Sequence, residues 1–591
     1  MKKLVALLLV GGLILNIAGF VGVTEVIKMD GNKSLGSTTL QGGNLNFTKS
    51  VILASDSDNY CAAIPLASKN KAPLILVAKP YGRIQHFLDL YRPSHIYEVG
   101  DTPFNGTLLS ESDLINYTTN ESNDYVVIAK KNGEYSGIAR YLASLHEGRL
   151  ILTNSLDDDT ILQRLKEIQP RYCALVWNPD DFKGNILWLY ANGNGVVISK
   201  STMTKFIEKM LIRIDSDPYM DVSFGFVTGS DATDASLLIS RKIVYNELNE
   251  EWKNRAMFAP SDLDSKKICD LIGLEWIGLA NKSYNAYNYL EELKNGVSWA
   301  CFFGHGSPVT LEFDTTPDHS SPYASFLTAC PKTYQEFINE GKDAVYLPDN
   351  LTIPPTIFTM DACFAGLTGN VYGMVTKKEW YDCDDFRNHS ISLRLIRAGA
   401  GAYIGSTTDG GIMNYAPYII MSAYNWSLGE AVRHIDNMFI ANGYFVKPFA
   451  VFKAEPRAIL FGDPAFKPSF PVKTNQSDFY DVEVKSFDAI NKTFMVLIHH
   501  KKNVSYSFGK VEINRKMADR LRIKFVNYPL LINKIQGVGF GFVPEMMIGH
   551  IIEEEHEKIY LCWHAMFIPA IGNHTLKIIA TPERPFVYVI E

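Results

Sequence analysis

Several common signatures of chemistry are missing from this sequence. It has no Gly-x-x-x-x-Gly-Lys-Ser/Thr phosphate loop, no His-Glu-x-x-His zinc motif and no Gly-x-Ser-x-Gly elbow. The eight cysteines are scattered without a Cys-x-x-Cys pair, which argues against a zinc finger or a thioredoxin-like motif. An excess of positive charge is also missing, because 57 Lys and Arg stand against 64 Asp and Glu and the net charge is −7. No global basic field would therefore attract a nucleic acid.

Long apolar runs are also lacking, with one exception at the N-terminus. A run from Leu4 to Val23 follows Met1-Lys2-Lys3 and is interrupted only by Asn16. A positive start and an apolar stretch are typical of an export signal. The run is also long enough for a membrane span of about 20 residues. We expect residues 1–24 to be a signal peptide or an uncleaved anchor, with the rest of the chain outside the cell.

Export would allow glycosylation at Asn-x-Ser/Thr sequons and disulfides between cysteines. There are thirteen Asn-x-Ser/Thr sequons, from Asn32 to Asn573, which suggests a glycoprotein. In an oxidising compartment Cys330 and Cys383 could form a disulfide, but the sequence alone does not pair them. His389 has no partner pattern and is interpreted as a surface or core histidine.

Between about residues 49 and 200, short apolar runs alternate with helix-like segments. The strand-like runs include 50–55, 72–77, 94–100, 125–129, 149–153 and 172–177. This alternation predicts parallel sheet. The segment 25–213 loosely resembles cell-wall-binding repeats, in which a strand, an Ala-rich helix and a strand like Ala72-Pro-Leu-Ile-Leu-Val recur. A plain α/β scaffold, or the first subdomain of the unit that follows, is the alternative.

A second α/β unit occupies residues 214–470, and a different pattern follows it. Its strand-like runs lie at 222–227, 255–260, 299–303, 355–361, 399–406 and 459–464. From 471 to 591, short alternating segments such as Tyr480-Asp-Val-Glu-Val predict an all-β sandwich. No catalytic constellation is visible in that last part.

Two runs of the second unit stop at residues that can perform catalysis. Trp299-Ala-Cys-Phe-Phe-Gly leads to His305, and Pro355-Thr-Ile-Phe-Thr-Met-Asp-Ala leads to Cys363. The carboxyl ends of parallel strands are where open α/β sheets carry their sites. Singly, such a cysteine is usually a core residue and such a histidine has no role. Together, at two strand ends, they predict a nucleophile and its base.

At this point the chain resembles the gingipain family of cysteine peptidases, within the caspase-like clan. The clan's two apolar blocks, ending in His-Gly and in Ala-Cys, are present as His305-Gly306 and Ala362-Cys363. The similarity extends to Gly401-Ala-Tyr-Ile-Gly-Ser-Thr, Leu428-Gly-Glu-Ala and Leu460-Phe-Gly-Asp-Pro. It covers about residues 221–470. It implies an open parallel-sheet catalytic domain of the caspase-like type, followed by an immunoglobulin-like sandwich.

The resemblance also implies roles for individual residues. The Cys363 thiolate would attack the scissile carbonyl, and His305 would act as general base and then as general acid. The N–H groups of Gly306 and Cys363 would hold the oxyanion, and the missing side chain of Gly306 would let substrate approach closely.

A third catalytic member is less well defined in this sequence. In the family, an acid that orients the histidine lies in the loop after the strand that precedes the His strand. Here that loop is Pro260-Ser-Asp-Leu-Asp, so Asp262 is assigned this role and Asp264 is second. The loop is shorter than in the family, which also carries a P1-binding acid there. Asp409 could line the specificity pocket instead, with a turn role in Asp-Gly-Gly as the alternative.

We expect an exported cysteine endopeptidase that acts on proteins or peptides, with no cofactor implied. Whether structural calcium is bound stays open. The alternatives are a non-catalytic surface or envelope protein with a caspase-like fold, and a thiol acyl-transferase that uses the same site. The sequence leaves the P1 preference open.

Overall fold

The computed structural model describes most of the chain up to residue 513 and four strands beyond it. The described ranges are 25–26, 45–110, 113–114, 121–182, 186–191, 194–197, 205–211, 214, 219–314, 322–368, 371–373, 383, 385–407, 412, 416–445, 456–488, 493–502, 506–513, 547–555, 558–566, 575–580 and 587–590. The N-terminal apolar run and Asp409 lie outside them. None of the helices in these ranges has the length and apolar character needed to cross a membrane.

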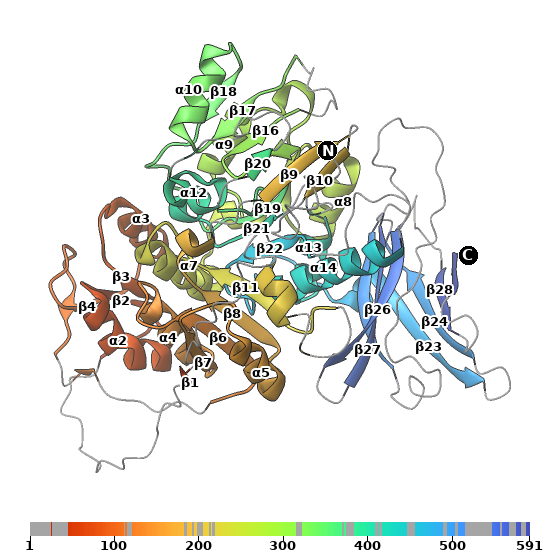
Figure 1. The fold of residues 1–591 in the computed structure, drawn as a ribbon, viewed down its shortest axis with the longest axis horizontal. Helices are drawn as coiled ribbons and strands as arrows, with labels where there is room; N and C mark the ends of the chain where they lie inside the picture. The colour runs from red at the N-terminus through yellow and green to blue at the C-terminus, as the bar shows by residue number, and fades with distance from the viewer. Residues whose placement is uncertain are drawn as a thin grey trace, which may run out of the picture.

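A large sheet forms the centre of the molecule (Figure 1). Its eleven described strands lie in the order β1 (Glu25–Val26), β7 (Arg149–Thr153), β6 (Tyr125–Lys130), β8 (Tyr172–Val176), β11 (Ser223–Val227), β22 (Ala458–Phe461), β21 (Ala402–Ser406), β19 (Ile357–Asp361), β14 (Trp299–Phe303), β12 (Arg255–Ala259) and β13 (Glu275–Gly278). Most neighbours are parallel, as the sequence predicts.

The large sheet departs from the predicted parallel arrangement at two places. β22 runs parallel to β11 but antiparallel to β21, and β1 runs antiparallel to β7. A strand that is buried on both faces has the same apolar composition in either direction. The sequence therefore located β22 without giving its direction.

Helices pack on both faces of the large sheet and on the smaller N-terminal sheet. Their bounds are α2 (Ser57–Asn70), α3 (Gly82–Tyr91), α4 (Ser136–Leu145), α5 (Asp159–Ile168), α7 (Ala232–Val244), α8 (Leu263–Ile272), α9 (Ala286–Asn295), α10 (Pro331–Asn339), α11 (Phe386–His389), α12 (Ile391–Ala398), α13 (Ala416–Ala423), α14 (Leu428–Phe445) and α15 (Gln476–Phe479). Alternate residues of β14 enter opposite cores: Trp299 and Cys301 join one apolar cluster, and Ala300 and Phe302 join another. Burial on both faces explains why the run before His305 is continuously apolar.

Smaller sheets flank this core. The N-terminal one has the order β3 (Leu74–Leu76), β2 (Ser50–Ala54), β4 (His95–Val99) and β5 (Thr107–Leu108). A second contains β15 (His305–Gly306), β16 (Thr310–Glu312), β17 (Phe326–Thr328) and β18 (Ala344–Tyr346), and a third contains β10 (Asn194–Val197), β9 (Ile186–Ala191) and β20 (Val371–Gly373).

The C-terminal part contains β strands in two antiparallel sheets, consistent with its alternating sequence. One has the order β23 (Tyr480–Asp488), β24 (Thr493–His500), β28 (Thr575–Ala580) and β29 (Val587–Ile590). The other has the order β25 (Tyr506–Ile513), β27 (Lys558–Met566) and β26 (Met547–Glu555). Figure 1 shows them in blue, to the side of the central sheet.

The α/β block that precedes residue 214 divides between two sheets. β2 to β5 form their own sheet, whereas β6, β7 and β8 belong to the large one. β8 pairs in parallel with β11, with Tyr172 opposite Ser223. Strands from the two predicted units, before and after residue 214, therefore belong to one sheet. The second half of this block thus shares its sheet with the strands that lead to His305 and Cys363.

Ion pairs also link α3, in the N-terminal part of the chain, to helices of the second α/β unit. Arg83 of α3 is almost fully buried and pairs with Asp231, the N-cap of α7, at 2.8 Å and with Asp234. Arg397 of α12 reaches Asp234 from the other side at 3.0 Å. This buried network connects α3, α7 and α12.

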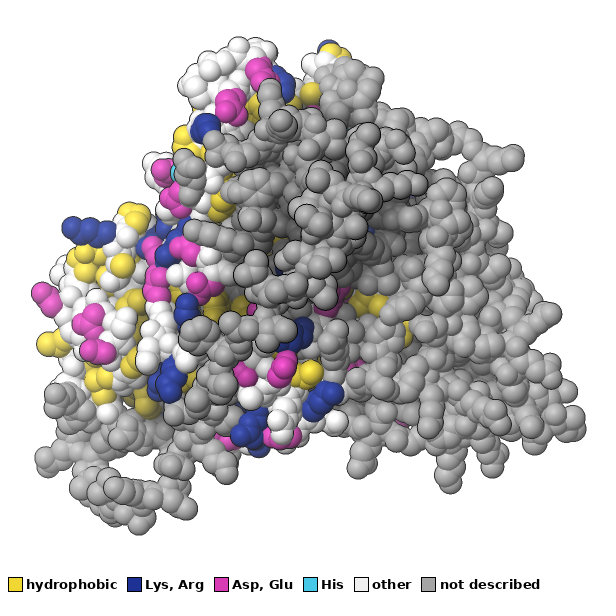
Figure 2. All heavy atoms as spheres, in the orientation of Figure 1, with side chains coloured by type: hydrophobic (Ala, Val, Ile, Leu, Met, Phe, Trp, Pro, Cys, Tyr) yellow, Lys and Arg dark blue, Asp and Glu magenta, His cyan; other side chains and the backbone are white. Residues whose placement is uncertain are grey.

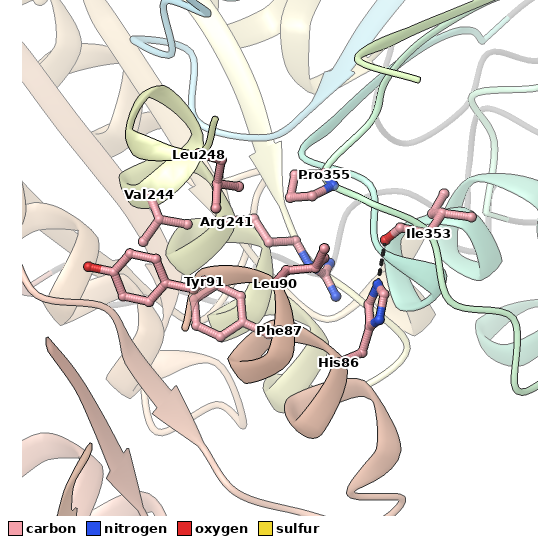
Figure 3. Close-up of a pocket in the computed structure, with 9 residues that line it drawn as sticks. All are labelled: His86, Phe87, Leu90, Tyr91, Arg241, Val244, Leu248, Ile353 and Pro355. Atoms are coloured by element: carbon pink, nitrogen blue, oxygen red, sulfur yellow. Dashed lines mark hydrogen bonds between the residues drawn. The ribbon is translucent and has the colours of Figure 1, made fainter. Parts of the chain in front are cut away.

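His86 makes a second contact between these parts (Figure 3). The ring lies beside a narrow hollow between α3 and α7, and its Nε2 donates a hydrogen bond to the carbonyl oxygen of Ile353 at 2.9 Å. Burial lowers the pKa of His86, although this hydrogen bond and nearby Asp89 oppose the shift and Arg241 adds to it. The neutral imidazole is therefore the form that the folded protein favours.

This lowered pKa predicts a pH-dependent stability contribution. A group with a depressed folded-state pKa contributes fully above its unfolded pKa, which is about 6.5 for histidine. The contribution is lost as the pH falls through the folded value. Between pH 8 and pH 5, we expect the free energy of unfolding to fall less in His86→Gln than in the wild type, measured by urea unfolding. His95→Gln in β4 is the control, and equal pH profiles for wild type and His86→Gln would refute the prediction.

Candidate active site

The site is built at the carboxyl ends of the neighbouring parallel strands β14 and β19. Their register places Phe303 opposite Asp361, and Gly304 N–H donates to the carbonyl oxygen of Asp361 at 3.2 Å. His305 and Cys363 each come two residues after this matched pair. The sheet thus brings together the two loops that the sequence singled out.

Gly306 lies against the loop that carries Cys363. A Cβ at Gly306 would be 2.8 Å from Ala362 Cβ and 3.5 Å from the carbonyl oxygen of Cys363. Any side chain at residue 306 would therefore push the two loops apart. This contact explains the need for glycine directly after His305.

Cys363 is followed by a tight, strained turn. Phe364 has φ of 57°, in the left-handed region that an aromatic residue rarely adopts. The turn is held by Tyr403 Oη, which donates to the Ala365 carbonyl at 2.6 Å, and by Gly366 N–H, which donates to the Ser406 carbonyl at 2.7 Å. Strain of this kind, of order 1–3 kcal/mol, persists where the surroundings enforce it and is common at active sites.

Exposure distinguishes Cys363 from most other cysteines of the chain. Cys363 and His305 are both partly exposed, whereas Cys301, earlier on β14, is 0% exposed. Burial raises the pKa of Cys301 well above the ordinary thiol value, and its Sγ lies 3.6 Å from Thr359 Oγ1. Cys301 is therefore a core thiol.

The acids named from the sequence occupy different positions. Asp262 caps α8 and accepts the Ser265 N–H at 2.6 Å, in a loop at the carboxyl end of β12, the strand next to β14. Asp264 lies in the first turn of α8 and pairs with Lys267 at 3.0 Å. Asp262 thus lies at the end of the loop that was expected to carry the His-orienting group, and Asp264 follows it in α8.

Asp361, the last residue of β19, hydrogen-bonds to the backbone. It is 4% exposed, and its Oδ1 accepts the Ile412 N–H at 2.7 Å. Asp361 therefore ties the end of β19 to the segment that follows β21.

Sequence reasoning missed the small sheet that begins at His305. His305 pairs with Glu312 and Gly306 with Leu311, which makes the loop after β14 the first strand of this sheet. β16 and β17 span three residues each, too few for an alternating pattern to be visible in the sequence. The hairpin holds the backbone of His305 in a fixed direction.

A large, mostly parallel sheet with a histidine and a cysteine on adjoining strand ends is the arrangement that a thiol hydrolase of the α/β class would use. The model of peptidase family C25 matches residues 118–469, and the chain belongs to this family of cysteine-type endopeptidases. The predicted gingipain resemblance is thereby confirmed. The match begins within the N-terminal α/β block and crosses the boundary at residue 213.

Solved structures were compared as well. The chain is similar to the complex of the pro- and mature domains of RgpB from Porphyromonas gingivalis, at 13% identity and a TM-score of 0.38, covering 79% of this chain and 99% of that one. It is also similar to the Arg-specific cysteine proteinase gingipain R, at 14% identity and a TM-score of 0.35, covering 80% and 99%. A third structure, described as a protease, has 11% identity, a TM-score of 0.36 and coverages of 79% and 96%. No curated protein matches the chain.

Proposed function

We propose that this protein is an exported cysteine endopeptidase in which Cys363 is the nucleophile and His305 the general base and acid. The observation that carries the proposal is the contact of the two loops at Gly306, which lies against Ala362 and Cys363. The partial exposure of both side chains leaves room for a substrate. Membership in family C25 supports protein or peptide substrates.

Further roles follow from this proposal. The N–H groups of Gly306 and Cys363 form the oxyanion hole. Asp262 orients His305, with Asp264 as the second choice, and Asp409 lines the substrate pocket. Residues 118–213 serve as the first subdomain of the peptidase, because β8 pairs with β11. The segment 1–24 exports or anchors the chain, and residues 471–591 form an immunoglobulin-like sandwich.

The exposed charges of the described surface agree with a protein substrate. Figure 2 shows acidic and basic side chains interspersed on the described part of one face, without a patch of one sign. The net charge of −7 is likewise modest for 591 residues. Such a surface gives no electrostatic reason to propose a nucleic-acid partner.

A P1 scan tests the proposed activity. The protein would be incubated under reducing conditions with fluorogenic peptides that differ only at P1, beside Cys363→Ala as the blank. We expect wild type to cleave a subset of the peptides, and Asp409→Ala to change the P1 preference if Asp409 lines the pocket. If the folded wild type cleaves none, also after proteolytic trimming, the peptidase proposal fails and a surface-binding protein becomes the better hypothesis. An added amine distinguishes transfer from hydrolysis, since an aminolysis product would reveal an acyltransferase.

Gly306→Ala is expected to lower kcat/KM by roughly 100-fold, the size of effect expected from a 1 Å misplacement of reacting groups. The new Cβ would lie 2.8 Å from Ala362 Cβ, a rigid neighbour, so the His305 loop must shift relative to Cys363. Gly82→Ala is the matched control, because a Cβ there meets nothing within 4 Å. Full activity of Gly306→Ala in the same assay would contradict the proposed geometry.

A further inference from the structure

A second cluster of reactive side chains lies apart from His305 and Cys363. Cys330 and Cys383 are 2% and 3% exposed, and both are free thiols. His389 is partly exposed, and one ring nitrogen lies within 4.8 Å of both sulfurs, which are themselves within 4.8 Å of each other. No partner pattern for His389 is visible in the sequence, and it is the fold that brings His389 to the two cysteines.

The cluster connects the two loops of the candidate active site. Cys330 follows β17, and the adjacent Ala329 N–H donates to the carbonyl oxygen of Val309 at 2.9 Å, four residues after His305. Cys383 precedes α11 and His389 is the last residue of that helix, on the part of the chain that follows Cys363. Val309 packs with Cys330 and Cys383 in one small apolar cluster.

Cys330 is the N-cap residue of α10, so its side chain lies at the first turn of that helix. Cysteine binds a metal as the thiolate, and metal binding releases the thiol protons.

We propose that Cys330, Cys383 and His389 form a site for a soft divalent cation, with zinc as the metal that this ligand set suits best. Two thiolates and one imidazole are typical zinc ligands. Two thiolates at about 2.3 Å from a tetrahedral zinc would be about 3.8 Å apart. This separation is compatible with ligand atoms that all lie within 4.8 Å of one another.

Charge and ligand number favour a metal over a disulfide. Two thiolates and one dication sum to zero, which suits a buried site better than an isolated thiolate does. A disulfide would use both sulfurs and leave the approach of His389 unexplained. With three protein ligands, the fourth position falls to water on the side of the partly exposed His389. The bound cation would join the His305 loop to the segment after Cys363.

Cobalt uptake tests the proposal without relying on peptidase activity. The full chain would carry Cys363→Ala, so that the nucleophile can neither bind metal nor cut the protein. It would be reduced with a phosphine, freed of metal and titrated with Co²⁺. We expect one equivalent to bind with a thiolate-to-cobalt charge-transfer band and the visible bands of tetrahedral cobalt, and zinc to displace it.

Variants then assign the ligands. Cys330→Ser and Cys383→Ser should each lower the intensity of the charge-transfer band, because one of the two thiolates is gone, and His389→Ala should weaken cobalt binding by at least about tenfold. Cys269→Ser, a buried thiol of α8 outside the cluster, is the control that should bind as the parent does. Far-UV circular dichroism establishes folding, and the partly exposed His389 gives a variant that does not disturb the core.

Two outcomes would overturn the proposal. One is a folded, reduced protein that takes up no more cobalt than its Cys330→Ser variant. The other is protein purified without reductant in which peptide mapping finds Cys330 linked to Cys383, and which binds no cobalt after reduction. Because each titration uses the Cys363→Ala background, failure here would leave the proposed peptidase function untouched.

Discussion

Cys363→Ala is expected to lower kcat by at least about 10⁴-fold, the scale seen when an enzyme loses its covalent nucleophile. The alanine removes the only atom that can form the thioester, and a methyl group in a partly exposed loop leaves the fold intact. The measurement is initial rates on the best peptide of the P1 scan, with thermal unfolding to establish equal stability.

Cys61→Ala is the matched control for this experiment. Cys61 is the other partly exposed cysteine of the chain, but it lies on α2, far along the chain from the site. Burial raises the pKa of Cys61, which makes its thiol a weak nucleophile. We expect Cys61→Ala to keep wild-type kinetics.

His305→Ala tests the partnership of the two residues. If His305 serves Cys363 as base, the single and double variants should show similar losses, because groups that act as a unit are not additive. Additive losses, or activity that survives Cys363→Ala, would rule out the proposed pair. The same assay thus separates a catalytic cysteine from a structural one.

Asp463→Asn is expected to destabilise the protein by about 3–5 kcal/mol, the cost of removing one partner from a buried ion pair. Asp463 follows β22 and is 3% exposed. It contacts His146 Nε2 at 2.6 Å and Lys242 Nζ at 2.9 Å, and accepts a hydrogen bond from Tyr125 at 2.8 Å. Asparagine would leave these partly buried groups without their counter-charge.

The pKa of Asp463 gives this prediction a pH signature. Burial opposes ionisation, but His146 and Lys242 outweigh it and hold the pKa of Asp463 well below its usual range. The stabilisation is therefore present above the unfolded pKa of about 3.9 and disappears as the pH falls toward the folded value. The decrease in the free energy of unfolding caused by Asp463→Asn, measured by urea unfolding, should become smaller below pH 4.

Asp181→Asn provides the control for Asp463→Asn. Asp181 pairs with Lys130 at 2.9 Å, but both side chains are more than a third exposed. Exposed pairs contribute about 0–1 kcal/mol, so we expect a change within that range. Equal effects of the two substitutions would contradict the assigned role of Asp463.

The sequence alone was sufficient to predict the family and the order of the main strands along the chain, and to select the two candidate catalytic residues. Strands buried on both faces must be continuously apolar, so β14 and β19 were visible as runs that stop at His305 and Cys363. The Gly-Asp-Pro block around Asp463 was likewise visible, although its role was not.

Only the tertiary structure decided which distant residues meet. The antiparallel direction of β22, the pairing of β8 with β11, and the cluster of Cys330, Cys383 and His389 depend on how the elements assemble. Local sequence patterns indicate whether a segment is buried and whether its apolar residues recur with the period of a helix or of a strand. They do so because burial selects residue types along one element. Contacts between residues 50 or more positions apart leave no such periodic mark. For this chain, therefore, the sequence determined the elements and the family, and the packed sheet decided the partners of each side chain.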